Sequence, residues 1–260
     1  LNSTPDPRRL AGSIQNHRGN RKEMRSTRIV RLRKRHDVPI SGNQAFYYNL
    51  TTGGPTKKAG NISRAFRIRG DLDIPALRRS IDLFIARHEA MRTVLKENRD
   101  GTITQTVLPE ARVVIQRSDL SDLPARRRLV EAKARFREDG RKPISMRRAP
   151  VIRVRVTRLA EADNFLSIFF AHGQFDAVSL AIFYLELTAF YRAFTAGEIP
   201  DWPAPRHQLI DYLALQKRRF TDESQQETEA YCRRTLEKAP ADTWCPSDAP
   251  VANDDNGKDR

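Results

Sequence analysis

Hydrophobic and polar residues alternate along several stretches of the chain, and this pattern predicts strands. The alternation is clear over residues 61–69, and again where Ile152, Val154 and Val156 are separated by arginines. Such a period of two is typical of strands that bury one face. The run 165–170 is almost entirely apolar, so we expect that strand to lie in the centre of its sheet.

Apolar residues at helical spacing predict helices between these strands. The clearest stripe follows Pro75, a residue that the first turn of a helix tolerates, and it comprises Leu77, Ile81, Phe84, Ile85 and His88. Further helices are predicted over 179–196 and from 207 through 219 to 239. Ser41 is placed to cap a short helix that carries Phe46 and two tyrosines.

Turn and cap residues complete the predicted fold. Asp100-Gly101 lies between two strand-like segments and predicts a hairpin. A strand over 112–116 should lead to a helix that ends near Glu138 and is capped by Ser118-Asp119 or by Ser121-Asp122. Strands mixed with helices and hairpins predict an α/β fold (an α+β sandwich), in which a mixed sheet is covered by helices, mainly on one side.

Positive charge is concentrated at the beginning of the chain. The 260 residues carry a formal net charge of +15 and have a pI near 10.4. Residues 1–36 contribute +9 of this charge, through eleven Lys or Arg against two acidic residues. Residues 1–28 have little apolar surface to bury, so we expect a basic disordered leader or linker there. Such an arm can bind phosphates, but no aromatic residue precedes Phe46 to stack on bases, so nucleic-acid binding is not favoured.

The cysteines and the hydropathy pattern narrow the class of protein. Cys232 and Cys245 have no neighbouring histidines at metal-ligand spacing, so we expect neither a metal site nor a disulfide framework. No signal-peptide core or continuous membrane-spanning run is visible in the sequence. We therefore expect a cytoplasmic protein, with an ordered domain over 29–245 and, over 246–260, a polar tail or the start of a linker.

His172 and Asp176 carry the clearest chemical signal. They follow the apolar run 165–170, in a bend that Gly173 keeps small enough for a substrate to approach. Imidazole has the side-chain pKa nearest to neutrality, so a His at a strand end can transfer a proton. His and Asp four residues apart also occur together by chance, and a buried structural His is the alternative interpretation.

Several sequence elements occur in an order that resembles one known family. They are a Ser-x-x-Gln element at 41–44, Arg-His-Glu-Ala-Met-Arg-Thr at 87–93, Gln105 after the hairpin, Ala-His-Gly-Gln-Phe-Asp-Ala at 171–177, Leu-Ile-Asp-Tyr at 209–212 and Cys-Pro-Ser-Asp-Ala-Pro at 245–250. Together they resemble the N-terminal lobe of a nonribosomal peptide synthetase condensation domain, which has the chloramphenicol acetyltransferase-like fold. The family motif is His-His-x-x-x-Asp-Gly, so Ala171 and Ala177 replace its first His and its Gly.

This resemblance implies roles for the site residues. His172 matches the second His of the motif, which would deprotonate the attacking amine, or orient it and stabilise the tetrahedral intermediate. Asp176 would hold the loop through an ion pair with an arginine. We expect Arg92 as that partner, with Arg87 second, because both belong to the 87–93 element. Gly173 and Ser179 are motif neighbours of the catalytic residue.

The resemblance also implies the partners of the chain. No metal or cofactor is expected within the domain, because the substrates are phosphopantetheine thioesters on peptidyl or acyl carrier proteins. The family's tunnel lies between two lobes, so we expect the isolated chain to be inactive without a missing C-terminal lobe, followed by an adenylation domain. Two alternatives stay open: a degenerate scaffold or carrier-docking lobe, which Ala171 and Ala177 favour, or a standalone acyltransferase that makes esters from CoA or carrier thioesters.

Overall fold

The computed structural model describes residues 28–52, 60–219, 222–237 and 239. The chain divides into two compact units, residues 1–216 and 217–260. Almost all of the predicted leader lies outside the described residues, and so do the predicted tail and the 245–250 element.

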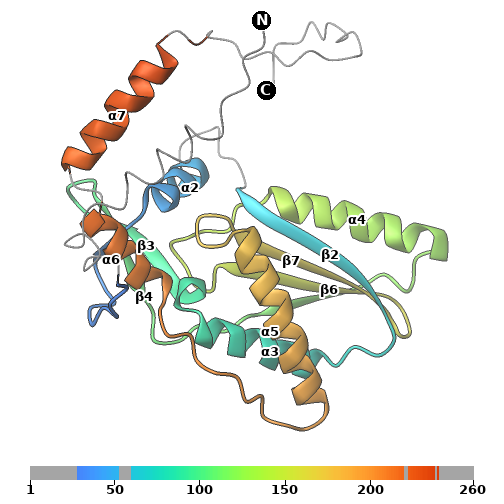
Figure 1. Ribbon diagram of the computed structural model, residues 1–260. Coiled ribbons are helices and arrows are strands. Elements are labelled where there is room, and N and C mark those ends of the chain that lie inside the picture. The colour runs from blue at the N-terminus through green and yellow to red at the C-terminus, as the bar shows by residue number, and fades with distance from the viewer. Residues whose placement is uncertain (1–27, 53–59, 220–221, 238, 240–260) are drawn as a thin grey trace, which may run out of the picture. The chain divides into compact units, whose positions relative to one another are not determined.

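A four-stranded mixed sheet forms the centre of the first unit (Figure 1). Its strands lie in the order β2 (Asn61–Arg69), β7 (Asp163–Ala171), β6 (Ile152–Ala160) and β5 (Ile115–Asp119). β7 is antiparallel to both of its neighbours, and β5 pairs in parallel with β6. The central position predicted for the apolar run 165–170 is therefore confirmed.

Both faces of the sheet are covered because β7 is apolar on both sides. Phe170 packs edge to face with Phe183 of α5 (Ala177–Thr195), at a centroid distance of 5.0 Å. α5 in turn packs against α3 (Ile74–Arg87). Phe169 points to the other face, where its ring stacks with Phe136 of α4 (Ala125–Arg141) at 5.3 Å. The mixed sheet covered by helices is confirmed, and α4 adds cover on the face that the sequence pattern leaves open.

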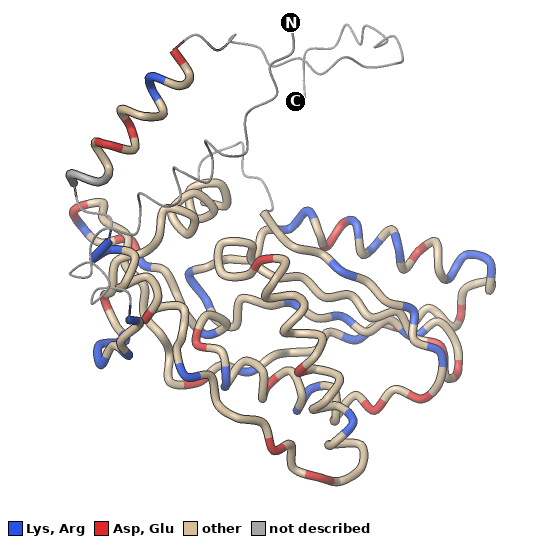
Figure 2. The backbone as a smooth tube through the Cα atoms, in the orientation of Figure 1, with Lys and Arg blue, Asp and Glu red and all other residues tan. Residues whose placement is uncertain are grey.

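α5 is the one helix in the described part of the chain that is long and apolar enough to cross a membrane. Leu180, Phe183, Leu187 and Phe190 from this helix are nevertheless buried within the unit. The length and composition of α5 are therefore those of a core helix. α4 differs, because Figure 2 shows Lys and Arg repeated along its length.

The local signals of several predicted elements are confirmed. Ser41 Oγ accepts a hydrogen bond from Gln44 N at 3.1 Å, and Gln44 Oε1 accepts one from Ser41 N at 2.8 Å, so a capping box begins α2 (Gly42–Thr52). The hairpin joins β3 (Thr93–Glu97) to β4 (Ile103–Val107), and with β1 (Val38–Pro39) it forms a second, smaller sheet. The apolar stripe predicted for α3 is buried as far as Ile85, and His88 lies just beyond the helix as its C-cap residue.

The predicted start of α4 is wrong. The preceding strand continues to Asp119 because β5 keeps its pairing with β6 as far as Arg158. The Asp119 side chain accepts a hydrogen bond from Ser121 N at 2.8 Å, within a turn. The helix begins only after Pro124, which offers no side-chain cap.

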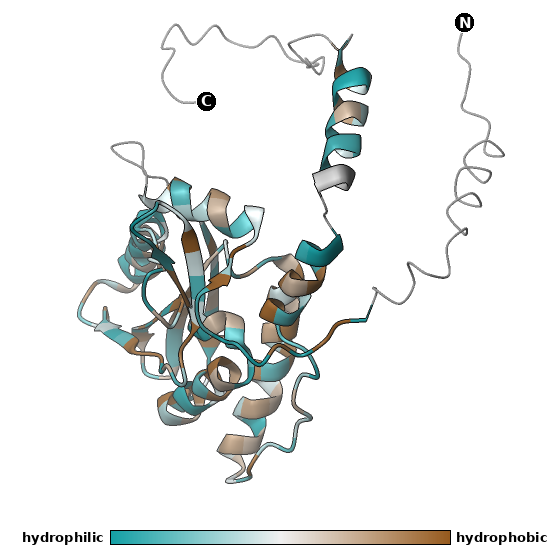
Figure 3. Ribbon diagram, turned by 90° about the vertical axis from the view of Figure 1, so that its left-hand side faces the viewer, coloured by the Kyte–Doolittle hydropathy of each residue, from teal (hydrophilic) through white to brown (hydrophobic). Residues whose placement is uncertain are grey.

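Beyond α3 the chain forms a short 3-10 helix, η3 (Glu89–Arg92), and after α5 it forms α6 (Leu209–Arg219) and α7 (Asp222–Leu236). The helical segments predicted from 207 to 239 are thus two helices. α7 belongs to the second unit, and its residues are mainly hydrophilic (Figure 3).

A polar network connects the segment before α2 to α6 and η3. Asp211 is fully buried and accepts hydrogen bonds from Leu32 N, Gln208 N and Arg35 Nη1, each at 2.9 Å. Arg35 Nε also donates to Glu89 Oε1 at 3.3 Å and lies 3.0 Å from Oε2. Arg35 therefore neutralises two carboxylates from distant parts of the chain.

Acid is expected to weaken this network. Burial by itself would raise the pKa of Asp211, but the amides of Gln208 and Leu32 and the charge of Arg35 hold this pKa below its ordinary value of 3.8. A carboxylate with a lowered folded pKa stabilises the protein fully above the unfolded pKa, and this stabilisation is lost as the pH falls through the folded value.

We predict that Asp211→Asn lowers the unfolding free energy by about 3 kcal/mol at neutral pH, because the charge of Arg35 loses its buried partner. The loss should shrink as the pH falls below about 4, because the unfolded chain then binds a proton that the folded carboxylate, with its lowered pKa, does not. Urea denaturation between about pH 6 and pH 3 measures both effects. Asp71→Asn removes an exposed carboxylate and is the matched control. Parallel pH curves for wild type and Asp211→Asn would contradict the prediction.

Candidate functional site

His172 lies at the end of the central strand, where the sequence predicts it. β7 ends at Ala171, and His172 N continues the pairing with the neighbouring strand by donating to Gly60 O at 3.1 Å. A tight turn follows, in which Phe175 N donates to His172 O at 3.4 Å, and α5 begins at Ala177. The sheet and α5 together therefore fix the position of the turn.

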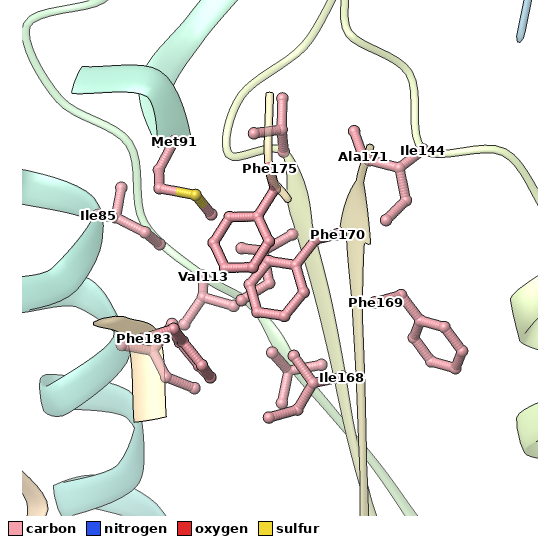
Figure 4. Close-up of a cluster of buried hydrophobic side chains, with 14 of the residues drawn as sticks. Ile85, Met91, Val113, Ile144, Ile168, Phe169, Phe170, Ala171, Phe175 and Phe183 are labelled. Carbon is pink, nitrogen blue, oxygen red and sulfur yellow. The ribbon is translucent and has the colours of Figure 1, made fainter. Parts of the chain in front are cut away.

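Phe175 anchors this turn in the hydrophobic core (Figure 4). Its side chain is buried, and its ring lies parallel to Phe170 at a centroid distance of 3.9 Å. Phe183 of α5 packs against the same pair. Aromatic pairs of this kind contribute about 0.5–1.5 kcal/mol beyond the burial of their area. The residue between His172 and Asp176 that matters most for rigidity is thus an apolar one.

The imidazole of His172 is held by stacking, and no hydrogen bond or ion pair joins it to a carboxylate of the described residues. Its ring lies 4.6 Å from the ring of Tyr47 in α2, with an interplanar angle of 17°. His172 Nδ1 is buried and has no hydrogen-bond partner among the described residues. The ring is only partly buried and lines a surface cleft.

Gly173 allows Tyr47 and Met146 to approach the turn closely. A Cβ atom at position 173 would lie 2.6 Å from Met146 Sδ and 3.0 Å from Tyr47 Cβ. Met146 is itself buried, so its side chain has little room to move. A larger residue at 173 would therefore push against the ring that supports His172.

Asp176 caps α5 and does not form the predicted ion pair. Its carboxylate accepts hydrogen bonds from Ser179 N at 2.8 Å and from Ser179 Oγ at 2.7 Å. These bonds are the main reason that its pKa lies below the ordinary value, and the charge of His172 adds a small effect in the same direction. Asp176 is exposed, so it needs no buried cationic partner.

Arg87 and Arg92 are engaged elsewhere. Arg87 Nε lies 3.1 Å from Oε2 of the buried Glu186, and His88 Nε2 lies 2.9 Å from the same oxygen. Arg92 donates to the carbonyl of Leu108. The expectation that either arginine pairs with Asp176 is therefore corrected, because the 87–93 element supports the fold around Glu186 and η3.

The cleft beside His172 has a volume of about 460 Å³. It is lined by the start of α2, by the 172–176 turn, by Ser179 and His88, and by residues 207–209. Four of the elements that carry the sequence resemblance therefore meet at one site. Within the described residues no three His, Cys, Asp or Glu side chains are grouped so as to hold a metal ion.

Three buried glutamines form a hydrogen-bond network beside the cleft, which the sequence analysis does not predict. Gln44 Nε2 donates to Gln105 Oε1 at 3.1 Å and to Gln174 Oε1 at 3.0 Å. Gln44 and Gln105 both occur in the sequence elements quoted above, but the sequence gives no sign that they touch. Tyr47 is a second omission, because an aromatic residue on α2 is equally typical of a core residue.

Comparison with known proteins identifies the family. The family model of the condensation domain matches residues 34–260. A linear gramicidin synthase of Brevibacillus parabrevis is 30% identical over 227 residues, which are 87% of this chain and 3% of the relative. Phosphinothricin tripeptide synthetase PhsC of Streptomyces viridochromogenes is 27% identical over 82% of this chain and 20% of the relative. The chain thus spans a small part of these curated relatives.

Solved structures share the fold. The X-domain from teicoplanin biosynthesis, in its complex with OxyB, is 25% identical with a TM-score of 0.68, covering 86% of this chain and 48% of that chain. The first condensation domain of the CDA synthetase gives a TM-score of 0.66 at 18% identity, covering 81% of this chain and 52% of that chain. This chain therefore corresponds to about half of each.

The structure places His172 directly after the end of β7 and Asp176 as the cap of α5. With a family model that covers most of its length, the chain belongs to the condensation domain family and has the chloramphenicol acetyltransferase-like fold of that family.

Proposed function

We propose that this chain is the N-terminal lobe of a condensation domain that forms amide bonds in a nonribosomal peptide synthetase. The observation that carries the proposal is the position of His172, which lines a cleft at the end of the central strand. In the proposed reaction the acceptor amine attacks the donor thioester, a C–N bond forms and the C–S bond breaks. The amine loses a proton and the donor thiol is released.

The surroundings of His172 favour an imidazole that acts without a carboxylate relay. No acidic oxygen among the described residues hydrogen-bonds its ring, and Nδ1 is unpartnered. An imidazole can accept the proton of the amine, or it can orient the amine and stabilise developing charge. Either role needs the ring to stay fixed, which the stacking on Tyr47 provides.

The partners follow from the same proposal. Both substrates would arrive as phosphopantetheine thioesters on peptidyl or acyl carrier proteins, with no cofactor or metal bound in the domain. A C-terminal lobe would supply the opposite wall of the tunnel, and an adenylation domain would charge the acceptor carrier. We place the whole assembly in the cytoplasm.

A non-catalytic lobe is the second candidate, because Ala171 and Ala177 depart from the family motif. The structure around these residues favours the active enzyme. Ala171 is buried at the end of β7, and its N donates to Val151 O at 3.1 Å, so the strand stays in register. Ala177 is the first residue of α5, a position that does not require glycine.

We predict that His172→Ala in the full-length parent synthetase lowers amide formation from loaded carriers by about a hundredfold or more, as expected for loss of a general base or charge-stabilising group. Single-turnover product formation measures the rate. His36→Ala, which removes an exposed imidazole outside the cleft, should leave the rate unchanged. A wild-type rate in the His172 variant would remove this residue from the mechanism and favour the scaffold.

We predict that Asp176→Ala lowers both the stability and the rate of amide formation, and that Asp176→Asn largely keeps both. Asp176→Ala removes the cap of α5 and should lower the unfolding free energy by about 1 kcal/mol, while slowing amide formation because the His172 turn loosens. Asp176→Asn keeps an oxygen acceptor for Ser179 N and should recover most of both losses. Urea denaturation measures the unfolding free energy, and amide formation from loaded carriers measures the rate. Wild-type stability and rate in the alanine variant would refute the role of Asp176.

Gly173→Ala should reduce the rate through Tyr47. The added methyl group would meet Met146 Sδ and Tyr47 Cβ, so the stacked pair of rings has to shift. We expect a rate at least tenfold lower, with part of it regained in Gly173→Ala/Met146→Ala, which makes room on the other side. Equal rates in wild type and the single variant would show that the close approach is not needed.

A further inference from the structure

The hydrogen bonds among the three buried glutamines have a fixed direction. Ser41 N donates to Gln44 Oε1 at 2.8 Å, so Nε2 must be the donor end of that amide. Gln44 Nε2 then donates to the Oε1 atoms of Gln105 and Gln174. Gln105 Nε2 in turn donates to Pro39 O at 2.9 Å. The backbone of α2 thereby determines the orientation of all three amides.

One donor at the end of this network is unused. Gln174 is 5% exposed, and its Nε2 has no hydrogen-bond partner among the described residues. Rotating this amide by half a turn would bring its Nε2 against Gln44 Nε2, donor against donor, so the mismatch cannot be relieved locally. A buried donor without an acceptor costs about 1–3 kcal/mol. Such exceptions in an otherwise satisfied network are typical of functional sites.

Gln174 lies where a bound substrate could supply the acceptor. It lines the same cleft as His172 and follows it by two residues in the turn. Both side chains contact α2, Gln174 through Gln44 and His172 through Tyr47. Gln44 and Tyr47 are three residues apart, and so lie on one side of that helix. The Gln174 amide and the imidazole are therefore anchored to the same side of α2, at the wall of one cleft.

We infer that Gln174 Nε2 donates a hydrogen bond to a carbonyl oxygen of the acyl-pantetheine substrate, which makes Gln174 a positioning residue. The inference rests on the proposed function. An amide N–H is a neutral donor, which suits a neutral carbonyl acceptor. Acyl-pantetheine offers two kinds, the thioester carbonyl and the amide carbonyls of the arm, and both present the same chemistry to Gln174.

The test compares binding of three ligands to the full-length parent protein. They are an acyl-pantetheine thioester, its thioether analogue in which a methylene replaces the thioester carbonyl, and an analogue with a methylene in place of an arm amide carbonyl. Gln174→Glu keeps the Oε1 acceptor for Gln44 and loses the donor. Gln105→Glu makes the same change in the same network, at a residue that does not line the cleft.

We expect wild type to bind the thioester about tenfold more tightly than one of the two analogues, as measured by calorimetry, which corresponds to one hydrogen bond. The analogue that binds weakly identifies the carbonyl. In Gln174→Glu this ratio should fall to about one, whereas Gln105→Glu should lose thermal stability and keep the wild-type ratio. A merely structural role for Gln174 would leave the ratio unchanged.

Several outcomes would overturn the inference. If Gln174→Glu keeps the wild-type ratio, or if wild type binds all three ligands equally, Gln174 does not hold a carbonyl. Either result leaves the proposed function intact as long as His172→Ala abolishes amide formation. If wild type binds none of the ligands and His172→Ala is as active as wild type, the proposed function fails together with the inference.

Discussion

Burial of β7 on both faces is the constraint on which the rest of the structure depends. Alternate residues of this strand point to opposite sides, so its phenylalanines demand apolar cover above and below the sheet. α5 meets one side through Phe183 and α4 meets the other through Phe136. Because the strand is held from both sides, the residue that follows it has a defined position, and that residue is His172.

The site is built by packing and neutral hydrogen bonds more than by charge. Phe175 pins the turn to the core, and Tyr47 stacks on the imidazole. The buried glutamines join the turn to α2 without any ion pair. The ion pairs of the buried Glu186 and Asp211 lie elsewhere. Glu186 connects α5 to Arg87 at the end of α3, and Asp211 connects α6 to Arg35 in the segment that precedes α2. Charge thus organises the scaffold, whereas the described residues that line the cleft are mainly uncharged, with Asp176 as the one carboxylate among them.

The sequence predicts those features whose cause is local. The bounds of β2, the Ser41 cap of α2 and the hairpin after β3 follow from alternation, from a capping serine and from one Asp-Gly pair. The start of α4 is missed because β5 continues to pair with β6, a contact between segments that are distant in sequence. The hydrogen-bond partners of side chains are missed for the same reason. The hydrogen bond from Gln44 to Gln174 spans 130 residues, and no local pattern marks it.

The corrected partner of Asp176 illustrates how a local bond can replace a long-range one. An exposed carboxylate at the start of a helix already finds two donors in Ser179, and the helix dipole favours its negative charge. An ion pair with Arg92 would have to draw that arginine away from Leu108 and Glu89. The capping bond holds the same loop and disturbs nothing else. Asp176 can therefore support His172 through α5, and the arginines of the 87–93 element remain available to hold the scaffold.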